Sequence, residues 1–575
     1  MKVLKFPRVL VSVTLLFAFA ASAVAAPASP ARAKPVAPKG TVIASAHALA
    51  TEAGFEVVAK GGNAFDAAVA VSAALSVVEP VSSGLGGGGF FLLHDAKTGK
   101  DIFIDARETS PASATPEKFL DAKGNLDTSK SQDGPWSAGI PGLPAALVYV
   151  SQKYGRLPLK TSLAPAIRIA RNGFPMYPRL AHALEERKDV IAQFPGSRAI
   201  FMPKGVPLKD GELLVQTDLA NTLQLTADKG FDGFYKGRVA QQILDAIKAE
   251  GGHWTASELS SYEVKQRAPI HFNYRGWSLV TAPPPSSGGI ALAEILQLLE
   301  PWDIRKLTPA KRTHLVVEAM RRAYHDRTFY LGDPDFVDVP QKTLLSPDYA
   351  DGLRTTIHPD KATPSLLFPN EPTPFEHEET THFSIIDAHG NKVGVTQTVN
   401  LEYGSGMIAP GTGVLLNDEM DDFALKAGTP NAFGVIGYAA NAPKPGKRML
   451  SSMSPTFMSR PGQEVVIGTP GGSRIITMVL LGILGYDAGL TPQQVAAIPR
   501  YHHQWLPDEI SIEPNALDAN TIKQLQAMGH VVKPRGSTWG NMQTVDWNTR
   551  TGELRGGTDP RNPVGTADVR ALKTH

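Results

Sequence analysis

Residues 378–387 read Glu-Glu-Thr-Thr-His-Phe-Ser-Ile-Ile-Asp and follow an acidic segment that is broken by prolines. Thr381, Phe383 and Ile385 alternate with their neighbours. This period of two predicts a strand with one set of side chains in a core and the other set facing elsewhere. Residues 387–400 supply a turn and a second alternating run. The whole segment is therefore a predicted β-hairpin.

Thr380 stands between the acidic segment and this strand, a position from which a hydroxyl can act as a nucleophile. A threonine hydroxyl needs a base, and if the chain is cut before Thr380 the new α-amine of that residue can serve as one. The high β-propensity of threonine is a plainer explanation for two threonines at the start of a strand. Taken alone, the two threonines are better explained by β-propensity. The motifs in the rest of the sequence make a nucleophilic role for Thr380 more plausible.

The composition excludes several classes of protein. With 575 residues, of which 42% are hydrophobic and 19% charged, the chain is long enough for a sizeable core and for more than one domain. A formal net charge of +2 provides no strong field for a polyanion, which argues against a nucleic-acid partner. The absence of cysteine excludes cysteine nucleophiles, disulfides and thiolate metal sites.

Residues 1–25 are a predicted export signal. A basic start precedes an apolar run at 9–21 that is short for a membrane span, and residues 23–25 fit the small-x-small cleavage pattern. We expect cleavage near Ala25 or Ala26, with an uncleaved signal anchor as the alternative. The mature protein is then periplasmic or secreted and has no membrane attachment.

Helical patterns dominate two long stretches. Residues 42–78 have apolar side chains at helical spacing, and a Gly-Gly-Asn break ends one helix before Asn63 or Asp66 caps the next. His47 falls off the apolar stripe, so we expect it to be solvated. We also expect residues 149–325 to be mostly helical.

A glycine-rich stretch at 82–89 resembles a phosphate-binding loop but runs into a strand rather than into a helix. We therefore expect the glycines to allow close backbone packing. Arg107 lies at the exit of the following strand, where a guanidinium could clamp a carboxylate in bidentate fashion. The residues alone favour an ordinary surface ion pair of Arg107 with Glu108 or Asp105.

Three later segments also carry candidate chemistry. Residues 418–422 hold four acids, which fit a solvated turn, calcium ligation or recognition of a cation. Residues 426–447 form a Pro/Gly/Asn-rich loop that is long enough to be a lid. Consecutive glycines at 468–474 precede a helix predicted from about Ile475, and their N–H groups suit either an oxyanion or a plain turn.

The histidines do not indicate a metal site. His377 and His382 are separated by a loop, and His502 and His503 are adjacent, so neither pair has the spacing that puts two histidines on one helix face. We expect no metal and no other cofactor. The chain also lacks G-x-S-x-G, the signature of the serine nucleophile in α/β-hydrolases.

Several of these motifs occur together in a specific order along nearly the whole mature chain. They lie at 61–68, 380–382, 416–423, 450–456, 468–474 and 556–561. In this order they resemble the γ-glutamyltranspeptidase (glutathione hydrolase) family of N-terminal-nucleophile hydrolases. The ordered set of motifs is far more specific for this family than any single motif.

The resemblance implies a precursor that cuts itself between Glu379 and Thr380. The products would be a large subunit, 26–379, and a small subunit, 380–575. The two would stay together in one intertwined domain with a four-layer αββα sandwich, an α+β fold.

The resemblance also implies a mechanism. Thr380 would attack a γ-glutamyl amide and form an ester, with the N–H groups of Gly471 and Gly472 as the oxyanion hole and Thr398 supporting the nucleophile. Water would complete hydrolysis, and the amine of an amino acid or dipeptide would complete transfer. Glutathione is the default donor of the family, and other γ-glutamyl compounds are expected substrates.

Recognition of the γ-glutamyl group is assigned by the same resemblance. The family's carboxylate clamp matches Arg107, Ser451 and Ser452. Its ammonium-binding positions match Asn400, Glu419 and Asp422.

This sequence departs from some family members at two of the matched positions. Glu419 stands where some bacterial members carry glutamine, and either side chain can accept a hydrogen bond from an ammonium. Phe433 lies in the predicted lid without the hydroxyl of a tyrosine, so a hydrogen bond from that side chain cannot close the lid.

Two rival functions fit parts of the same sequence. Related cephalosporin acylases act on glutaryl groups, which lack the α-ammonium, and Asp422 would then be a costly carboxylate against an apolar methylene. The other rival is a non-catalytic exported γ-glutamyl-peptide binder that never cuts itself. The acid at position 422 favours the γ-glutamyl hydrolase and transferase.

Overall fold

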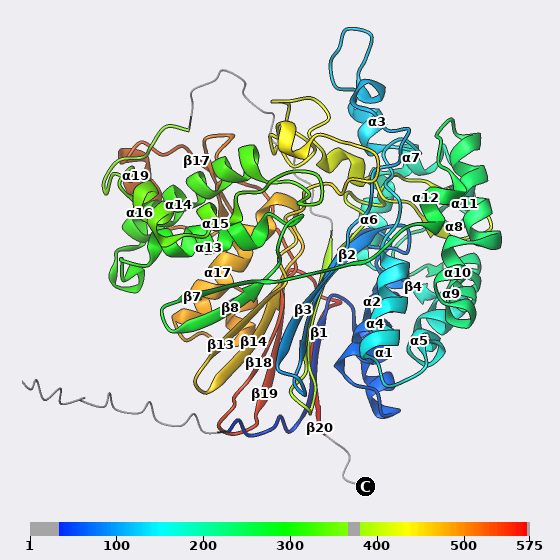
Figure 1. Ribbon diagram of the computed structural model, residues 1–575, viewed down its shortest axis with the longest axis horizontal. Helices are drawn as coiled ribbons and strands as arrows, with labels where there is room; N and C mark the ends of the chain where they lie inside the picture. Colours follow the sequence, from blue (N-terminus) through cyan, green and yellow to red (C-terminus); the bar gives the residue numbers. More distant parts are fainter. Residues whose placement is uncertain (1–33, 366–379, 572–575) are drawn as a thin grey trace, which may run out of the picture. The chain divides into compact units, whose positions relative to one another are not determined.

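Two β-sheets lie face to face, and helices cover the outer face of each (Figure 1). The computed structural model describes residues 34–365 and 380–571, so the predicted export signal at 1–25 and residue Glu379 lie outside the described residues. From Val36 onward the chain forms one compact unit. The four-layer αββα sandwich expected from the sequence is confirmed.

The first sheet has seven strands and the second has six. In spatial order the first consists of β20 (Thr566–Ala571), β1 (Gly40–Ser45), β9 (Thr381–Ile386), β10 (Lys392–Thr398), β2 (Gly88–Asp95), β3 (Lys100–Ala106) and β6 (Lys265–Arg267). The second consists of β19 (Leu554–Thr558), β18 (Gln543–Trp547), β14 (Gln463–Gly468), β13 (Thr456–Arg460), β8 (Trp277–Thr281) and β7 (Ile270–Tyr274).

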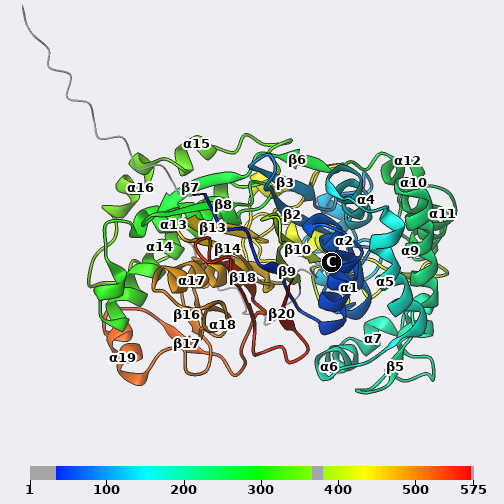
Figure 2. The same ribbon diagram turned by 90° about the horizontal axis from the view of Figure 1, so that it is seen from below.

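The helices divide between the two outer layers (Figure 2). On the side of the first sheet lie α1 (Ala48–Ala59), α2 (Ala64–Val78), α4 (Leu143–Tyr154), α5 (Leu159–Asn172), α6 (Pro178–Glu186), α7 (Lys188–Ile191), α8 (Pro195–Phe201), α9 (Thr217–Lys229), α10 (Phe231–Tyr235), α11 (Gly237–Ala249) and α12 (Ala256–Ser260). On the side of the second lie α13 (Gly288–Leu299), α14 (Pro309–Tyr330), α15 (Gln341–Leu344), α16 (Pro347–Arg354), α17 (Ile475–Asp487), α18 (Pro492–Ala496) and α19 (Ala519–Ala527).

The remaining elements are short. They are α3 (Thr128–Gln132), β4 (Phe174–Pro175), β5 (Leu213–Leu214), β11 (Ile408–Ala409), β12 (Val414–Leu415), β15 (Tyr501–His502), β16 (Ile510–Ile512) and β17 (Val532–Pro534). Among the residues that the structure describes, no helix is both long enough and apolar enough to cross a membrane.

The predicted hairpin is formed by β9 and β10, which pair with Gln397 opposite Thr381. Both faces of β9 are buried. Phe383 and Ile385 pack toward the helices over the first sheet, whereas the hydroxyl of Ser384 donates a hydrogen bond to the carbonyl of Gln543 in the second sheet. The sequence did not indicate what covers the other face of this strand. In the structure the second sheet covers that face.

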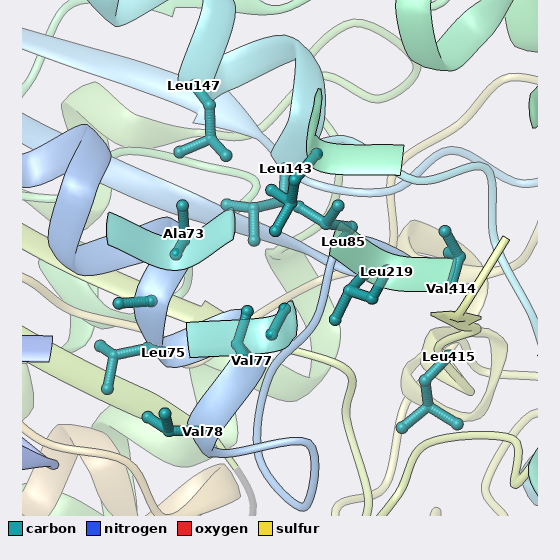
Figure 3. Packing of buried hydrophobic residues seen from close by; sticks show 14 of the residues in the cluster. Ala73, Leu75, Val77, Val78, Leu85, Leu143, Leu147, Leu219, Val414 and Leu415 are labelled. Atoms are coloured by element: carbon teal, nitrogen blue, oxygen red, sulfur yellow. The ribbon is translucent and has the colours of Figure 1, made fainter. Parts of the chain in front are cut away.

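Helix α2 anchors the first helical layer. Asn63 and Asp66 form a capping box at its N-terminus, so both predicted capping residues take part. All residues of α2 are buried, as its run of alanine and valine predicts. Figure 3 shows Ala73 and Leu75 of this helix among the side chains of the buried cluster that also contains Leu143 and Leu147 of α4. The small side chains let α2 pack against β9 and β10 on one side and α4 on another.

The expectation that the helical stretch begins at Val42 is wrong. Residues 40–45 form β1, which pairs with β9 and β20, because a short run of small apolar residues fits a buried strand as well as a helix. The solvated position expected for His47 is also wrong. His47 is 8% exposed and caps α1, where its Nδ1 accepts the N–H of Leu49 at 3.1 Å, and burial lowers the pKa of His47 to about 4.

The helical expectation for 149–325 is wrong over residues 265–281, which form β6, β7 and β8. In β7 the side chains of Ile270, Phe272 and Tyr274 are buried, and those between them are exposed. This period of two was a readable strand signal. Helical patterns flank this segment on both sides, and for that reason the strand signal was overlooked.

The glycine-rich stretch serves close packing, as expected. A Cβ on Gly86 would lie 1.9 Å from the carbonyl oxygen of Leu415, and a Cβ on Gly87 would lie 2.0 Å from that of Thr398. Gly86 also forms a bridge with Leu416. The loop thereby holds the chain after β10 against the start of β2.

Replacing Gly86 by alanine should destabilise this contact, because the backbone of Leu415 cannot move aside without breaking the bridge. We expect the free energy of unfolding to fall by roughly 1–3 kcal/mol, the range for overpacked sites, observed as a lower melting temperature. In the control variant Gly352→Ala an added Cβ meets nothing within 4 Å, so its melting temperature should be unchanged or slightly higher. Equal melting temperatures for the two variants would contradict this packing role.

Candidate active site

Thr380 is buried immediately before β9, with 4% of its surface exposed. Its hydroxyl donates a hydrogen bond to Oγ1 of Thr398 at the end of β10, over 3.3 Å. The same Thr398 oxygen accepts the backbone N–H of Asn400 at 2.8 Å. The pairing of the two hairpin strands therefore places the three residues together.

Thr380 borders a pocket that gathers residues from several separate motifs. Arg107 follows β3, and Thr398 and Asn400 lie at the end of β10. Glu419 and Asp422 are on a short 3₁₀ helix, Glu419–Asp422. The predicted site residues on its lining are Thr380, Thr398, Arg107, Asn400, Glu419, Asp422, Ser451, Ser452 and Gly472. The predicted Gly471 lines a neighbouring pocket instead.

Arg107 is the centre of charge in this pocket and is only 1% exposed. Its Nη1 lies 2.5 Å from a carboxylate oxygen of Glu419, and its Nη2 lies 2.5 Å from one of Asp422. Glu108 is a third acid, 3.5 Å from Nη1. The surface ion pair favoured by the residues alone is therefore wrong, because this guanidinium is buried and its closest acids, Glu419 and Asp422, lie on one 3₁₀ helix far along the chain.

Burial and charge act in opposite directions on these groups. Burial works against the charged guanidinium, but attraction to Glu419, Asp422 and Glu108 outweighs it and holds the pKa of Arg107 above its ordinary value. Burial raises the pKa of Glu108 to about 7, although Arg107 opposes this. Burial also raises the pKa of Glu419 and of Asp422 against the same opposing charge. The pocket lining thus offers two acids, Glu419 and Asp422, and two guanidinium groups, Arg107 and Arg327, so it has partners for both a cation and an anion.

The solvated turn considered for residues 418–422 is wrong, because the segment is largely buried. Asp418 accepts the N–H of Leu401 at 2.9 Å, and Asp421 accepts the hydroxyl of Ser131 at 2.6 Å. Of the alternatives for this segment, recognition of a cation fits the pocket best, since Glu419 and Asp422 point into it.

The histidines of interest serve other purposes. His382 contacts the hydroxyls of Thr396 and Ser384 at 2.8 and 3.0 Å, within the space between the sheets. His377 lies outside the described residues. Elsewhere, His314, Glu318 and His530 come close enough to hold an ion. However, the carboxylate of Glu318 already accepts hydrogen bonds from an arginine and a threonine.

The glycine motif precedes α17 as predicted, through a 3₁₀ turn, Gly472–Arg474. Gly471 has φ 133° and Gly472 has φ 52°, a backbone region that favours glycine. A Cβ on Gly472 would lie 2.4 Å from the ring of Phe433, so there is also no room for a larger residue at this position. The turn brings backbone N–H groups to the edge of the Thr380 pocket.

The predicted lid loop lies over the pocket. Asn431 donates a hydrogen bond to Asp422 at 3.1 Å and accepts the N–H of Phe433 at 3.1 Å. The side chain of Gln504 donates to the carbonyl of Phe433, also at 3.1 Å. The loop is thus held by an asparagine and by its own backbone, without a hydroxyl on the aromatic ring.

Arg327 is a pocket residue that the sequence reasoning missed. It lies on α14 and is buried, and its guanidinium donates to the hydroxyls of Ser287 at 3.1 Å and Ser452 at 3.4 Å. Burial lowers the pKa of Arg327, and Asp422 partly opposes this. No motif surrounds Arg327 in the sequence, so only its position in space reveals it.

Comparison with known proteins identifies the family of this chain. The family model described as gamma-glutamyltranspeptidase matches residues 50–569. The chain belongs to the γ-glutamyltranspeptidase family. It is 43% identical to the glutathione hydrolase proenzyme of Escherichia coli strain K12, over 92% of this chain and 91% of that protein. It is 35% identical to the glutathione hydrolase proenzyme of Bacillus subtilis strain 168, over 91% of this chain and 90% of that protein.

Solved structures place this family member among the N-terminal-nucleophile hydrolases. Cephalosporin acylase from Bacillus halodurans matches with a TM-score of 0.82 and 29% identity, over 96% of this chain and 99% of that chain. Helicobacter pylori gamma-glutamyltranspeptidase matches with a TM-score of 0.55 and 42% identity, over 56% of this chain and 93% of that chain. The chain is thus an enzyme of this family with the expected fold.

Glu108 should make the stability of this enzyme depend on pH. Its folded-state pKa of about 7 lies above its ordinary value of 4.5, so its stabilising contribution is full below pH 4.5 and is lost as the pH rises through 7. Glu108→Gln removes the ionisable group, so the variant does not lose this stabilising contribution as the pH rises. Relative to the unmodified protein, the variant should gain roughly 2–3 kcal/mol between pH 5 and pH 8, measured by chemical denaturation.

The control is Glu250→Gln at an exposed position after α11. The difference in free energy of unfolding between this variant and the unmodified protein should be the same at pH 5 and at pH 8. If Glu108→Gln behaves in that way too, Glu108 is ionised at both pH values in the folded protein and the assigned pKa is wrong.

Proposed function

We propose that this enzyme is an exported, self-processing γ-glutamyltranspeptidase and glutathione hydrolase. It cleaves γ-glutamyl amides through an ester on Thr380 and passes the group to water or to the amine of an amino acid or peptide. The observation that carries the proposal is the position of the Thr380 hydroxyl beside a pocket built around Arg107 and its acids.

The ionic contacts in the pocket support a zwitterionic ligand. A γ-glutamyl group carries an α-carboxylate and an α-ammonium on one carbon. The carboxylate pairs with Arg107 and the hydroxyls of Ser451 and Ser452, and the ammonium pairs with Asn400, Glu419 and Asp422. Each ligand charge then replaces one half of an existing ion pair, so no buried charge is left without a partner.

The reaction at Thr380 follows from this placement. The oxygen of its hydroxyl attacks the γ-carbonyl carbon while its proton passes to the α-amine of the same residue, with Thr398 orienting the hydroxyl. The N–H groups of Gly471 and Gly472 stabilise the oxyanion. The amide C–N bond breaks, and the leaving amine takes the proton. Water or a second amine then opens the ester.

Processing of the precursor uses the same hydroxyl. Thr380 attacks the carbonyl of Glu379, the C–N bond breaks as the ester forms, and water opens the ester to leave two chains. The large subunit, 26–379, and the small subunit, 380–575, stay associated as one intertwined domain. The names of the relatives, which are proenzymes, support this step. The reaction needs no cofactor and no metal.

The export signal predicted at 1–25 supports a periplasmic or secreted enzyme. Its expected partners are small molecules: glutathione, other γ-glutamyl compounds and amine acceptors. Nucleic acid and membrane are not among them.

A glutaryl acylase is the second candidate, because two relatives are named acylases. They are the cephalosporin acylase of Bacillus halodurans and the acylase ACY 1 proenzyme of a Pseudomonas strain, which is 33% identical over 90% of this chain. The buried Glu419 and the partly buried Asp422 favour the γ-glutamyl substrate, since a glutaryl group has no cation to neutralise them.

The two candidates are separated by kcat/KM for γ-glutamyl-p-nitroanilide and for glutaryl-7-aminocephalosporanic acid. We expect the unmodified enzyme to prefer the first. In Asp422→Asn the preference should fall at least about tenfold, because a buried charged hydrogen bond to the ammonium is lost. The control variant Asp421→Asn changes an acid that faces Ser131 instead, so its effect should be equal on both substrates. An unmodified enzyme that prefers the glutaryl compound would contradict the proposal.

A further inference from the structure

The last turn of the lid loop contacts the backbone that carries both halves of the proposed γ-glutamyl site. This turn is a 3₁₀ helix, Ala439–Asn441. Asn441 is 7% exposed and lines a small cavity with Leu450 and with Asp422, which also lines the Thr380 pocket. Asp422 belongs to the proposed ammonium site, and Leu450 directly precedes Ser451 of the proposed carboxylate clamp.

The side-chain amide of Asn441 joins two segments that lie on either side of the lid loop in the sequence. Its nitrogen donates a hydrogen bond to the backbone carbonyl of Asp422 at 2.6 Å, and its oxygen accepts the backbone N–H of Leu450 at 2.9 Å. The backbone carbonyl of Asn441 also accepts the N–H of Ala424 at 3.0 Å. One planar group thus sets the distance between the chain at 422–424 and the chain at Leu450.

This bridge requires a donor and an acceptor on one short side chain, which asparagine provides. An ionised aspartate at position 441 could accept from Leu450 but could not donate to Asp422, and alanine could do neither. Removing the amide would therefore take a partner from two buried backbone groups, which is costly unless the segments move. A change at position 441 is thus expected to shift the two segments relative to each other.

A buried lysine holds the turn that carries Asn441. Lys447 is 0% exposed, and its ammonium donates to the carbonyl oxygens of Ala440 at 2.7 Å and Ala442 at 2.8 Å, the two residues that flank Asn441. Burial lowers the pKa of Lys447 to about 8, although Asp333 opposes this. Because burying an ammonium is costly without close partners, we interpret Lys447 as a fixed support for this turn.

The lid loop has other attachments that do not involve Asn441. The ring of Tyr438 stacks on that of Phe329 in α14, with 4.8 Å between the ring centroids. Asn431 bonds to Asp422, and Gln504 bonds to Phe433, nearer the other end of the loop. Replacement of Asn441 should therefore leave the loop folded and change mainly the spacing that its amide sets.

We propose that Asn441 is a positioning residue for γ-glutamyl recognition. Its amide fixes the spacing between Asp422, which receives the α-ammonium, and Ser451, which receives the α-carboxylate, and Lys447 supports it. The two charged groups of an α-amino acid are attached to one carbon, so a protein that binds both must keep its own two partners at a constant separation. This inference rests on the proposed function, because that function assigns the two groups to Asp422 and Ser451.

The test compares two competitive inhibitors of γ-glutamyl-p-nitroanilide cleavage that differ only in the α-ammonium. L-Glutamate carries this group and glutarate lacks it, so the ratio of their inhibition constants, glutarate over L-glutamate, measures recognition of the ammonium together with the carboxylate. In Asn441→Ala this ratio should fall about tenfold, since a hydrogen bond to a charged group is weakened. The variant should still cut itself into two chains, because self-processing does not require γ-glutamyl recognition.

Two lysine variants make the test specific. Lys447→Met removes the support of the turn and should lower the ratio in the same direction as Asn441→Ala. Lys444→Met changes an exposed lysine of the same loop and should leave the ratio unchanged. If Asn441→Ala does not fold, which its melting temperature would reveal, Lys447→Met decides the matter.

The outcomes separate this inference from the proposed function. If the unmodified enzyme does not cleave the anilide, or binds glutarate as tightly as L-glutamate, the proposed function fails and the inference fails with it. If the unmodified enzyme prefers L-glutamate and Asn441→Ala weakens both inhibitors by the same factor or weakens neither, the γ-glutamyl site stands and the positioning role of Asn441 is overturned.

Discussion

The pairing of β9 on both sides is the constraint on which the site depends. This strand hydrogen-bonds to β1 along one edge and to β10 along the other, and it is buried on both faces. Thr380 immediately precedes it, so the ladder to β10 determines which residue faces the threonine hydroxyl. A chain cut before Thr380 would keep both ladders and the buried contacts of Phe383 and Ile385, each worth roughly 1.5–3 kcal/mol. Thr380, the proposed nucleophile, is therefore held by parts of the fold that do not need the bond preceding it.

A second constraint is the charge at Arg107. Burying one guanidinium with three carboxylates is costly unless each charge has a close partner. Within the protein, Glu419 and Asp422 supply those partners at 2.5 Å. Under the proposed function the same cost would make the pocket selective, because a ligand that separates these ion pairs must offer both a carboxylate and a cation in return. A zwitterionic α-amino acid group has both, and a glutaryl group has only the first.

Much of the site could be predicted because its residues lie in motifs that are readable along the chain. The hairpin around Thr380, the acids around Glu419 and the glycine at 472 have local signatures, and the structure brings them to one pocket. The burial of Arg107 could not be read from its neighbours, since a strand exit is equally compatible with solvent. Arg327 could not be found at all, because a single arginine on a long helix has no local signal. In the fold, β1 was hidden for a related reason, since this short run of small apolar residues becomes a strand by pairing with the distant β9 and β20. β7 did carry a readable period of two, but it lies between helical stretches.

The central claim is that Thr380 becomes the N-terminal residue of a separate chain and then serves as nucleophile. Intact mass spectrometry of the purified mature protein beside Thr380→Ala tests it most directly. The account predicts two chains in the unmodified protein, the smaller beginning at Thr380, and a single uncut chain in the variant. An unmodified protein that stays whole under folding conditions would contradict the account, because the α-amine that activates the hydroxyl would not exist.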